Sequence, residues 1–234
     1  MSVSSLATAT LRTAFLVVLG VLYLGVAVTS AQEGRKDAMG DQLLEAIAEG
    51  DAASVRELLA ASTSTDARDA SGRTALLLAT RADNLEIARL LIEAGADVNA
   101  KDAMEDTPFL YAGAEGRNEI LKLILRHGPK LDDTNRYGGT ALIPAAHHGH
   151  PETVSLLLAA GVDVDHVNKL GWTALLEAVI LGDGGPTYLK IVELLLDGGA
   201  DWRIADRDGV TALEHARQRG FHDIAARLQD AAGG

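Results

Sequence analysis

Residues 87–100 read IARLLIEAGADVNA and contain the pattern that decides the fold. Apolar residues at helical spacing lead up to Gly95, and a turn-forming Asp-Val-Asn run follows. We expect a helix that ends at Gly95, because glycine tolerates the left-handed conformation of a helix C-cap. Leu-rich segments recur before Gly128, Gly161 and Gly198, so helices are expected to end at those residues too.

A threonine motif repeats in step with these helices. The threonines at 74, 107, 140, 173 and 211 are separated by 33, 33, 33 and 38 residues. A Thr hydroxyl directly before an apolar run is placed to cap a helix. Each unit is therefore predicted to hold two short helices, such as 74–82 and 85–94. One such pair cannot bury both of its apolar faces, whereas stacked pairs form one continuous core.

The repeat resembles that of the ankyrin repeat family, whose unit carries Gly-x-Thr-Pro-Leu, a Gly-His turn, a Leu-rich helix and Gly-Ala-Asp-Val-Asn. Gly149-His150 matches the turn, and residues 87–100 match the end of the unit. The resemblance covers residues 39–232 and implies an all-α, ankyrin-repeat solenoid of about six helix-turn-helix units with turn or hairpin tips. The expected repeats are 39–68, 69–101, 102–134, 135–167, 168–205 and 206–232, of which the first and last are caps, and 233–234 form a tail.

The fifth repeat is longer than the others, and the excess falls between its two helices. Residues 182–188 contain three glycines and a proline, so we expect a loop that protrudes from the array. Two interpretations stay open: a tolerated surface insertion, or a contact loop beside the binding surface.

The N-terminus has the pattern of a targeting segment. Arg12 precedes an unbroken apolar run, 14–28, and small residues follow it. This is typical of a signal peptide, and the run is short for a membrane span, which needs roughly 20 apolar residues. We therefore predict an apolar signal helix over 1–31 (or a membrane anchor) and a linker over 32–38. The protein is expected to be exported, either periplasmic or secreted; the alternative is an inner-membrane anchor with the repeats outside the cytoplasm.

Composition excludes several classes of function. The chain of 234 residues has a formal net charge of −12, and an acidic chain is a poor ligand for nucleic acid. It has no cysteine, which excludes disulfides, thiolate nucleophiles and Cys-based metal sites. We find no nucleophile elbow, phosphate loop or His-Glu-x-x-His motif. We therefore expect no enzyme activity, no cofactor and no small-molecule substrate, and contact with a membrane only through an uncleaved N-terminal segment.

Histidines in the fourth repeat form the one candidate metal cluster. His147, His148 and His150 lie close together in the sequence. Neighbouring residues on a helix diverge by about 100°, which makes joint chelation by His147 and His148 difficult. The expectation is that no metal binds, with a metal-dependent protein using these three histidines kept as an alternative.

The resemblance also places a protein-binding surface. Ankyrin arrays bind partners through their concave face, which the tips and the exposed side of the inner helices form. The family's variable positions include several basic residues here, so we expect this face to be locally positive. Trp172 has a competing interpretation, since it can simply pack on its neighbouring turn. The candidate partner-binding residues are Arg73, Arg81, Met104, Arg136, Tyr137, His147, His148, Lys169, Trp172, Arg207 and Arg219.

These observations favour an exported, non-catalytic scaffold that binds a protein partner through its concave face. A narrower similarity, to secreted bacterial ankyrin proteins, suggests a second hypothesis. In that hypothesis the chain is an accessory factor that supports an extracytoplasmic oxidative-stress enzyme such as catalase.

Overall fold

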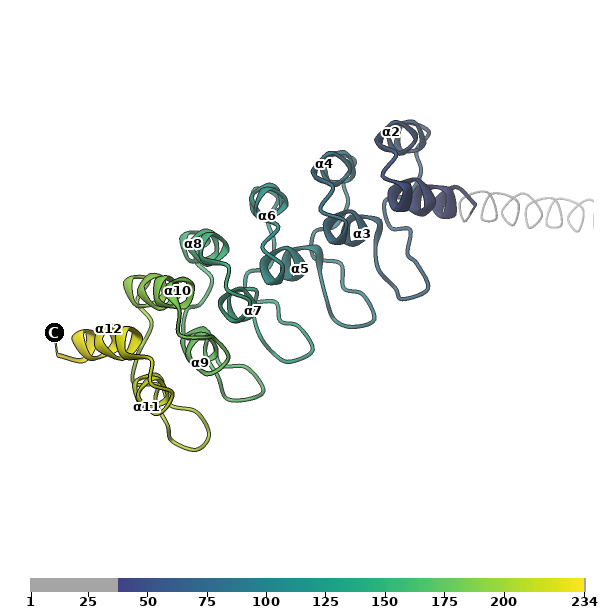
Figure 1. Cartoon of the computed structure of the whole chain (residues 1–234). Coiled ribbons are helices and arrows are strands. Elements are labelled where there is room, and N and C mark those ends of the chain that lie inside the picture. The colour runs from purple at the N-terminus through teal and green to yellow at the C-terminus, as the bar shows by residue number, and fades with distance from the viewer. Residues whose placement is uncertain (1–37, 234) are drawn as a thin grey trace, which may run out of the picture.

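The computed structural model describes residues 38–233, which form helices stacked in antiparallel pairs (Figure 1). The first pair consists of a helix whose described part is 38–49 and of α2 (Ala52–Ala60). Five further pairs follow in chain order, and the described residues contain no β-strand. They are α3 (Ala75–Arg81) with α4 (Leu85–Glu93), α5 (Pro108–Ala114) with α6 (Asn118–Leu125), α7 (Leu142–His147) with α8 (Pro151–Ala160), α9 (Ala174–Ile180) with α10 (Pro186–Asp197), and α11 (Ala212–Gln218) with α12 (His222–Gly233).

Long turns, here called tips, connect each pair to the next and project on the side of α3, α5, α7, α9 and α11 (Figure 1). Two of them close with an isolated antiparallel bridge, one of which joins Arg68 to Thr74. These are the hairpin tips that the sequence predicts. The predicted all-helical solenoid is therefore confirmed for the described residues, whereas residues 1–37, which include the predicted signal segment and nearly all of the linker, lie outside them.

We call the first helix of each pair the inner helix and the second the outer helix. Threonine caps begin four of the inner helices, as predicted. The Thr74 hydroxyl accepts a hydrogen bond from the Leu77 backbone N–H at 3.2 Å, and Thr107, Thr173 and Thr211 cap their helices in the same way. Thr140 departs from the pattern. The Ile143 N–H donates to the Thr140 backbone carbonyl instead, so α7 begins later, at Leu142.

Left-handed glycines lie at or shortly after the ends of the outer helices α4, α6 and α8. Gly95, Gly128 and Gly161 have positive φ, as the sequence predicts. In the fifth repeat α10 ends at the predicted Gly198, but that residue has φ −78° and the left-handed conformation falls on Gly199, with φ +91°. Gly198 still closes the last helical turn, so the left-handed residue that redirects the chain comes one position later.

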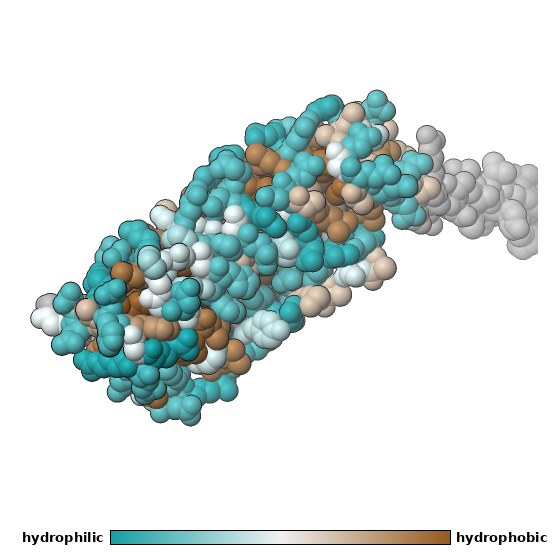
Figure 2. All heavy atoms as spheres, in the orientation of Figure 1, coloured by the Kyte–Doolittle hydropathy of each residue, from teal (hydrophilic) through white to brown (hydrophobic). Residues whose placement is uncertain are grey.

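One continuous apolar core runs through the array. It extends from Leu43 to Leu228, and inner helices pack on inner helices and outer on outer in neighbouring pairs. Leu157 of α8 is fully buried within it. The face seen in Figure 2 is mostly hydrophilic, with brown apolar patches toward both ends of the array. Each pair thus depends on its neighbours for burial, as expected of a solenoid.

The inserted segment of the fifth repeat is packed, which corrects the prediction of a protruding loop. Pro186 is the first residue of α10, and the insertion lengthens this helix to 12 residues. Proline suits this position because the first N–H of a helix has no intrahelical partner. The Tyr188 hydroxyl donates to the His147 carbonyl at 2.7 Å, and Arg219 donates to the Gly182 carbonyl at 3.0 Å. The segment therefore joins the fourth, fifth and sixth repeats.

Candidate functional site

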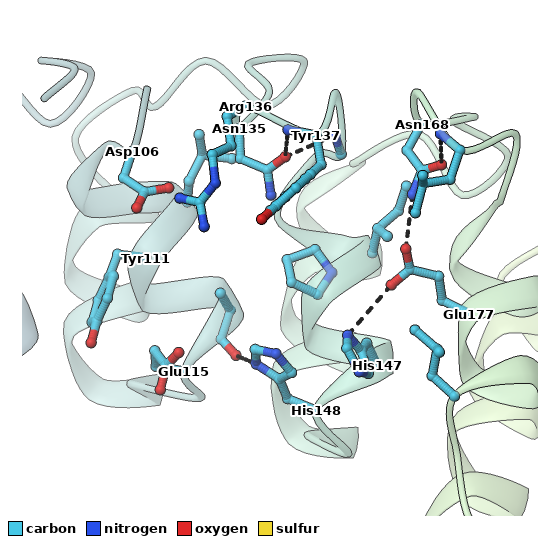
Figure 3. A pocket seen from close by; sticks show the side chains of 17 residues that line it. Asp106, Tyr111, Glu115, Asn135, Arg136, Tyr137, His147, His148, Asn168 and Glu177 are labelled. Carbon is cyan, nitrogen blue, oxygen red and sulfur yellow. Dashed lines mark hydrogen bonds and ion pairs between the residues drawn. The ribbon is translucent and has the colours of Figure 1, made fainter. Parts of the chain in front are cut away.

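A pocket of about 410 Å³ opens among the third, fourth and fifth repeats (Figure 3). Its walls come from α5, α7 and α9 and from the tips that precede these three helices. This places it on the concave face, by which we mean the surface formed by the tips and by α3, α5, α7, α9 and α11. The volume falls within the range of small-ligand sites, about 300–1,000 Å³.

The tips beside this pocket have a fixed conformation. The Asn135 side-chain oxygen accepts hydrogen bonds from the backbone N–H groups of Tyr137 and Gly139, at 2.9 and 3.1 Å. Asn168 does the same for Leu170 and Trp172. Such Asx turns hold a tip rigid without a strand. The residue two positions after each Asn therefore projects from a preorganised turn.

Large apolar side chains occupy this projecting position in three consecutive tips. Met104, Tyr137 and Leu170 each lie three residues before the repeated Thr, and their exposed fractions are 48%, 54% and 48%. We call these three residues the tip stripe. The same position holds Ser71 in the second repeat and Asp208 in the sixth. The stripe therefore covers only the third to fifth repeats.

Glu177 is the buried acid of the pocket. It lies on α9 with 6% of its surface exposed, and its Oε1 accepts a hydrogen bond from Asn168 Nδ2 at 2.8 Å. Its Oε2 lies 3.7 Å from Nδ1 of His147, beyond hydrogen-bond range (Figure 3). Burial raises the pKa of Glu177 to about 7, and the hydrogen bond from Asn168 acts in the opposite direction. The carboxyl group is therefore poised to change charge near neutral pH.

The two candidate histidines of α7 line the same pocket. Nδ1 of His148 lies 2.7 Å from the Ala114 carbonyl oxygen, so this ring is held against the third repeat. Burial, and then the charge of His148, lower the pKa of His147 and favour its neutral form. Between residues 38 and 233, no group of three or more His, Cys, Asp and Glu side chains is arranged to hold a metal ion. The metal-dependent alternative therefore has no support from the geometry.

Two of the predicted basic contact residues hold neighbouring tips together. Lys169 Nζ donates to the Arg136 carbonyl at 2.9 Å, and the Arg207 guanidinium donates to the Lys169 carbonyl. Arg73 is similarly engaged, in an ion pair with Asp69 of its own tip. These cations are occupied within the array.

Three other arginines lie over aromatic rings. The guanidinium carbons of Arg81 and Arg136 are each 4.6 Å from a tyrosine ring centroid, Tyr111 and Tyr137 respectively. Arg219 lies over Phe221 and donates to the Gly182 carbonyl. Of these arginines only Arg136 lines the pocket, and three acids, Asp106, Glu115 and Glu177, line it too. The expectation of a locally positive surface therefore fails at the pocket.

Trp172 is partly buried against the apolar core and is not part of the pocket wall. This agrees with the packing interpretation. Of the candidate residues, the structure brings Arg136, Tyr137, His147 and His148 together at the pocket. Arg73, Arg81, Met104, Lys169, Trp172, Arg207 and Arg219 lie outside its wall.

Sequence reasoning missed Glu177 and its partner Asn168. A signal was present, because the position nine residues after the tip Asp or Asn differs in every repeat. It holds Leu78, Tyr111, Pro144, Glu177 and His215. The fifth repeat has an acid where the other repeats have an apolar, aromatic or imidazole side chain. That this acid is buried becomes evident only once the stacking of the helices is known.

Comparison with known proteins gives a consistent result. A family model described as ankyrin repeats (3 copies) matches residues 43–135, 109–206 and 145–233. The chain is 57% identical to a solved ankyrin repeat domain from Acinetobacter baumannii AYE, with a TM-score of 0.79, over 81% of this chain and 97% of that one. It is 46% identical to the solved ankyrin repeat protein EF0377, with a TM-score of 0.78, over 80% and 96% of the two chains.

A curated protein, ankyrin repeat protein YahD of Escherichia coli, is 50% identical over 52 residues. These residues are 22% of this chain and 26% of that protein, so the match spans about a quarter of its length.

Proposed function

Since the chain belongs to the ankyrin repeat family, we propose that it is a non-catalytic scaffold that binds a protein partner through the concave face of its third to fifth repeats. The observation that carries this proposal is the distribution of exposed apolar side chains. Between residues 38 and 233, the large hydrophobic residues with substantial exposure are the tip stripe, Val167 and Leu181. All five lie at tips or at the end of an inner helix, and all lie in these three repeats.

Exposed apolar residues that cluster on one surface mark interaction sites, because isolated ones are common but contiguous ones are rarely left to solvent. The tip stripe is held by rigid turns, so a partner would lose little conformational entropy by ordering it. Tyr137, with Arg136 over its ring, offers the aromatic and guanidinium groups that interface hot spots favour. This surface suits a protein partner.

We also propose that the repeats work outside the cytoplasm. The support is the signal-like pattern of residues 1–31, with its apolar run and small-residue exit. No helix between residues 38 and 233 has the length and apolarity that crossing a bilayer requires. The proposed location is periplasmic or secreted, with attachment to the inner membrane if the segment is retained.

Affinity capture with a matched pair of variants tests the scaffold proposal. Tyr137→Ala combined with Leu170→Ala removes two exposed side chains of the tip stripe and should reduce capture of the partner at least tenfold without changing helical content. Glu93→Ala, an exposed change at the end of α4, should leave capture intact. Equal capture by the double variant and the wild type would refute a concave-face interface.

A further inference from the structure

Glu177 is buried, and no lysine or arginine among residues 38–233 forms an ion pair with it. Its Oε1 accepts a hydrogen bond from the neutral amide of Asn168, and its Oε2 lies 3.7 Å from Nδ1 of His147. A buried carboxylate normally has a positive partner, since removing an isolated charge from water is unfavourable. Figure 3 shows Glu177 in the wall of the pocket, with its carboxyl group directed toward His147.

The sixth repeat pairs such an acid with an imidazole. Asp206 and His215 occupy the positions of Asn168 and Glu177, again nine residues apart. There Nε2 of His215 lies 2.7 Å from Oδ2 of Asp206, so acid and imidazole satisfy each other. In the fifth repeat the tip position holds the neutral Asn168, and the helix position holds the acid Glu177. The fifth repeat therefore has no imidazole at this position to pair with its acid.

The other charges of the pocket do not supply Glu177 with a cation. Arg136 lies over Tyr137, and contact with this side chain, followed by the charges of Asp106 and Asp102, raises its pKa. Within residues 38–233, Arg136 forms neither an ion pair nor a hydrogen bond with Glu177. Glu115 adds a further acid to the wall. The wall of this cavity of about 410 Å³ thus holds three acidic side chains and one arginine.

We propose that this pocket receives one lysine or arginine side chain of the protein partner, with the charged end against Oε2 of Glu177 and the aliphatic stem along Leu181 and Ile143. This proposal rests on the scaffold function and specifies its partner. Long basic side chains bury their stems on apolar walls while the charged end meets a polar group. Oε2 accepts no hydrogen bond within the described residues, so an ammonium or guanidinium group would find a free acceptor.

Model tripeptides test the proposal without knowledge of the partner. The probes are N-acetyl-Gly-X-Gly-amide with X as lysine, arginine, norleucine or glutamate, titrated into ¹⁵N-labelled protein and followed by NMR. The lysine and arginine probes should shift the amide signals of Asn168, Glu177 and Leu181 with saturation, and norleucine, which keeps the stem but not the charge, should bind at least tenfold more weakly. Equal binding of norleucine, or preference for glutamate, would overturn the proposal.

Two variants assign the effect to this carboxylate. Glu177→Gln keeps the shape and the acceptor for Asn168 and should weaken the basic probes about tenfold, whereas Glu93→Gln, the same change on exposed α4, should not. Leu181→Lys places a cation at the pocket wall, where Leu181 is exposed. The introduced ammonium group should take the place of the probe's charged end beside Glu177 and so exclude the basic probes. Unchanged binding in Glu177→Gln or Leu181→Lys would refute the assignment.

The test is separable from that of the scaffold function. Suppose that Tyr137→Ala with Leu170→Ala abolishes capture of the partner, while Glu177→Gln changes neither this capture nor the binding of the basic probes. The scaffold function is then supported and the cation site is refuted. If the basic probes bind through Glu177 but the double variant of the tip stripe captures the partner as well as the wild type, the concave-face scaffold is refuted instead.

Discussion

The hydroxyl of Tyr188 donates a hydrogen bond to the backbone carbonyl of His147 across 41 positions of sequence, at 2.7 Å. His147 lines the pocket and Tyr188 belongs to the lengthened α10, so the insertion of the fifth repeat supports the pocket from behind. Burial, and then the charge of Asp183, raise the pKa of Tyr188, which keeps the phenol protonated and able to donate.

Tyr188→Phe should destabilise the protein by about 1 kcal/mol, the typical net contribution of one hydrogen bond. The physical reason is that the His147 carbonyl loses its side-chain donor while the aromatic packing is kept. Urea unfolding followed by circular dichroism measures the change. Tyr137→Phe is the matched control, because the exposed Tyr137 ring should tolerate loss of its hydroxyl within about 0.5 kcal/mol. Equal effects in the two variants would contradict the link between α10 and α7.

Leu157→Ala should cost about 2–5 kcal/mol, as truncations of fully buried leucines do. Leu157 lies on α8, in the middle of the array, so the loss also weakens the contact between the repeats on either side. A broader or two-step unfolding transition is therefore expected. Leu170→Ala, on an exposed tip residue, should change stability little, and a comparable loss in that variant would speak against the core assignment.

Much of the fold could be predicted because its signals are local. A Thr cap depends on the residue and on the three that follow, and Thr74, Thr107, Thr173 and Thr211 all form one. Pro186 shows the limit of such reasoning. Proline and glycine break a helix interior but suit a helix start, and sequence alone did not distinguish the two cases.

The candidate site was less predictable because its properties arise between repeats. Lys169 and Arg207 read as free cations in the sequence, yet their partners are carbonyl groups of the preceding tip, 33 and 38 positions away. Glu177 becomes buried only because α7, α9 and α11 stack side by side. Periodicity locates the face on which these residues lie. It does not predict which charged groups form hydrogen bonds to a neighbouring repeat or become buried against it.

Export with cleavage of the N-terminal segment predicts the mass of the mature protein. If residues 1–31 are removed, mass spectrometry of the protein from an extracytoplasmic fraction should find an N-terminus near Gln32. A full-length mass in the membrane fraction would instead establish the anchored form. Recovery of the full-length chain from the cytoplasm alone would contradict export in either form.

Glu177 should make stability fall as pH rises from about 4.5 to about 7. The ordinary pKa of the carboxyl, 4.5, applies to the unfolded chain, and burial raises it to about 7 in the folded protein. Below this window the group is protonated in both states. Within it the unfolded chain loses the proton first, so each step upward in pH favours unfolding, and above it the loss is complete at about 3 kcal/mol. Glu177→Gln removes this titration. Urea unfolding at pH 4.5 and pH 8 should therefore show the variant gaining stability over the wild type at the higher pH, whereas Glu93→Gln should show no such gain. A difference between Glu177→Gln and the wild type that does not change with pH would mean that the carboxyl titrates normally and is not held in a desolvated pocket.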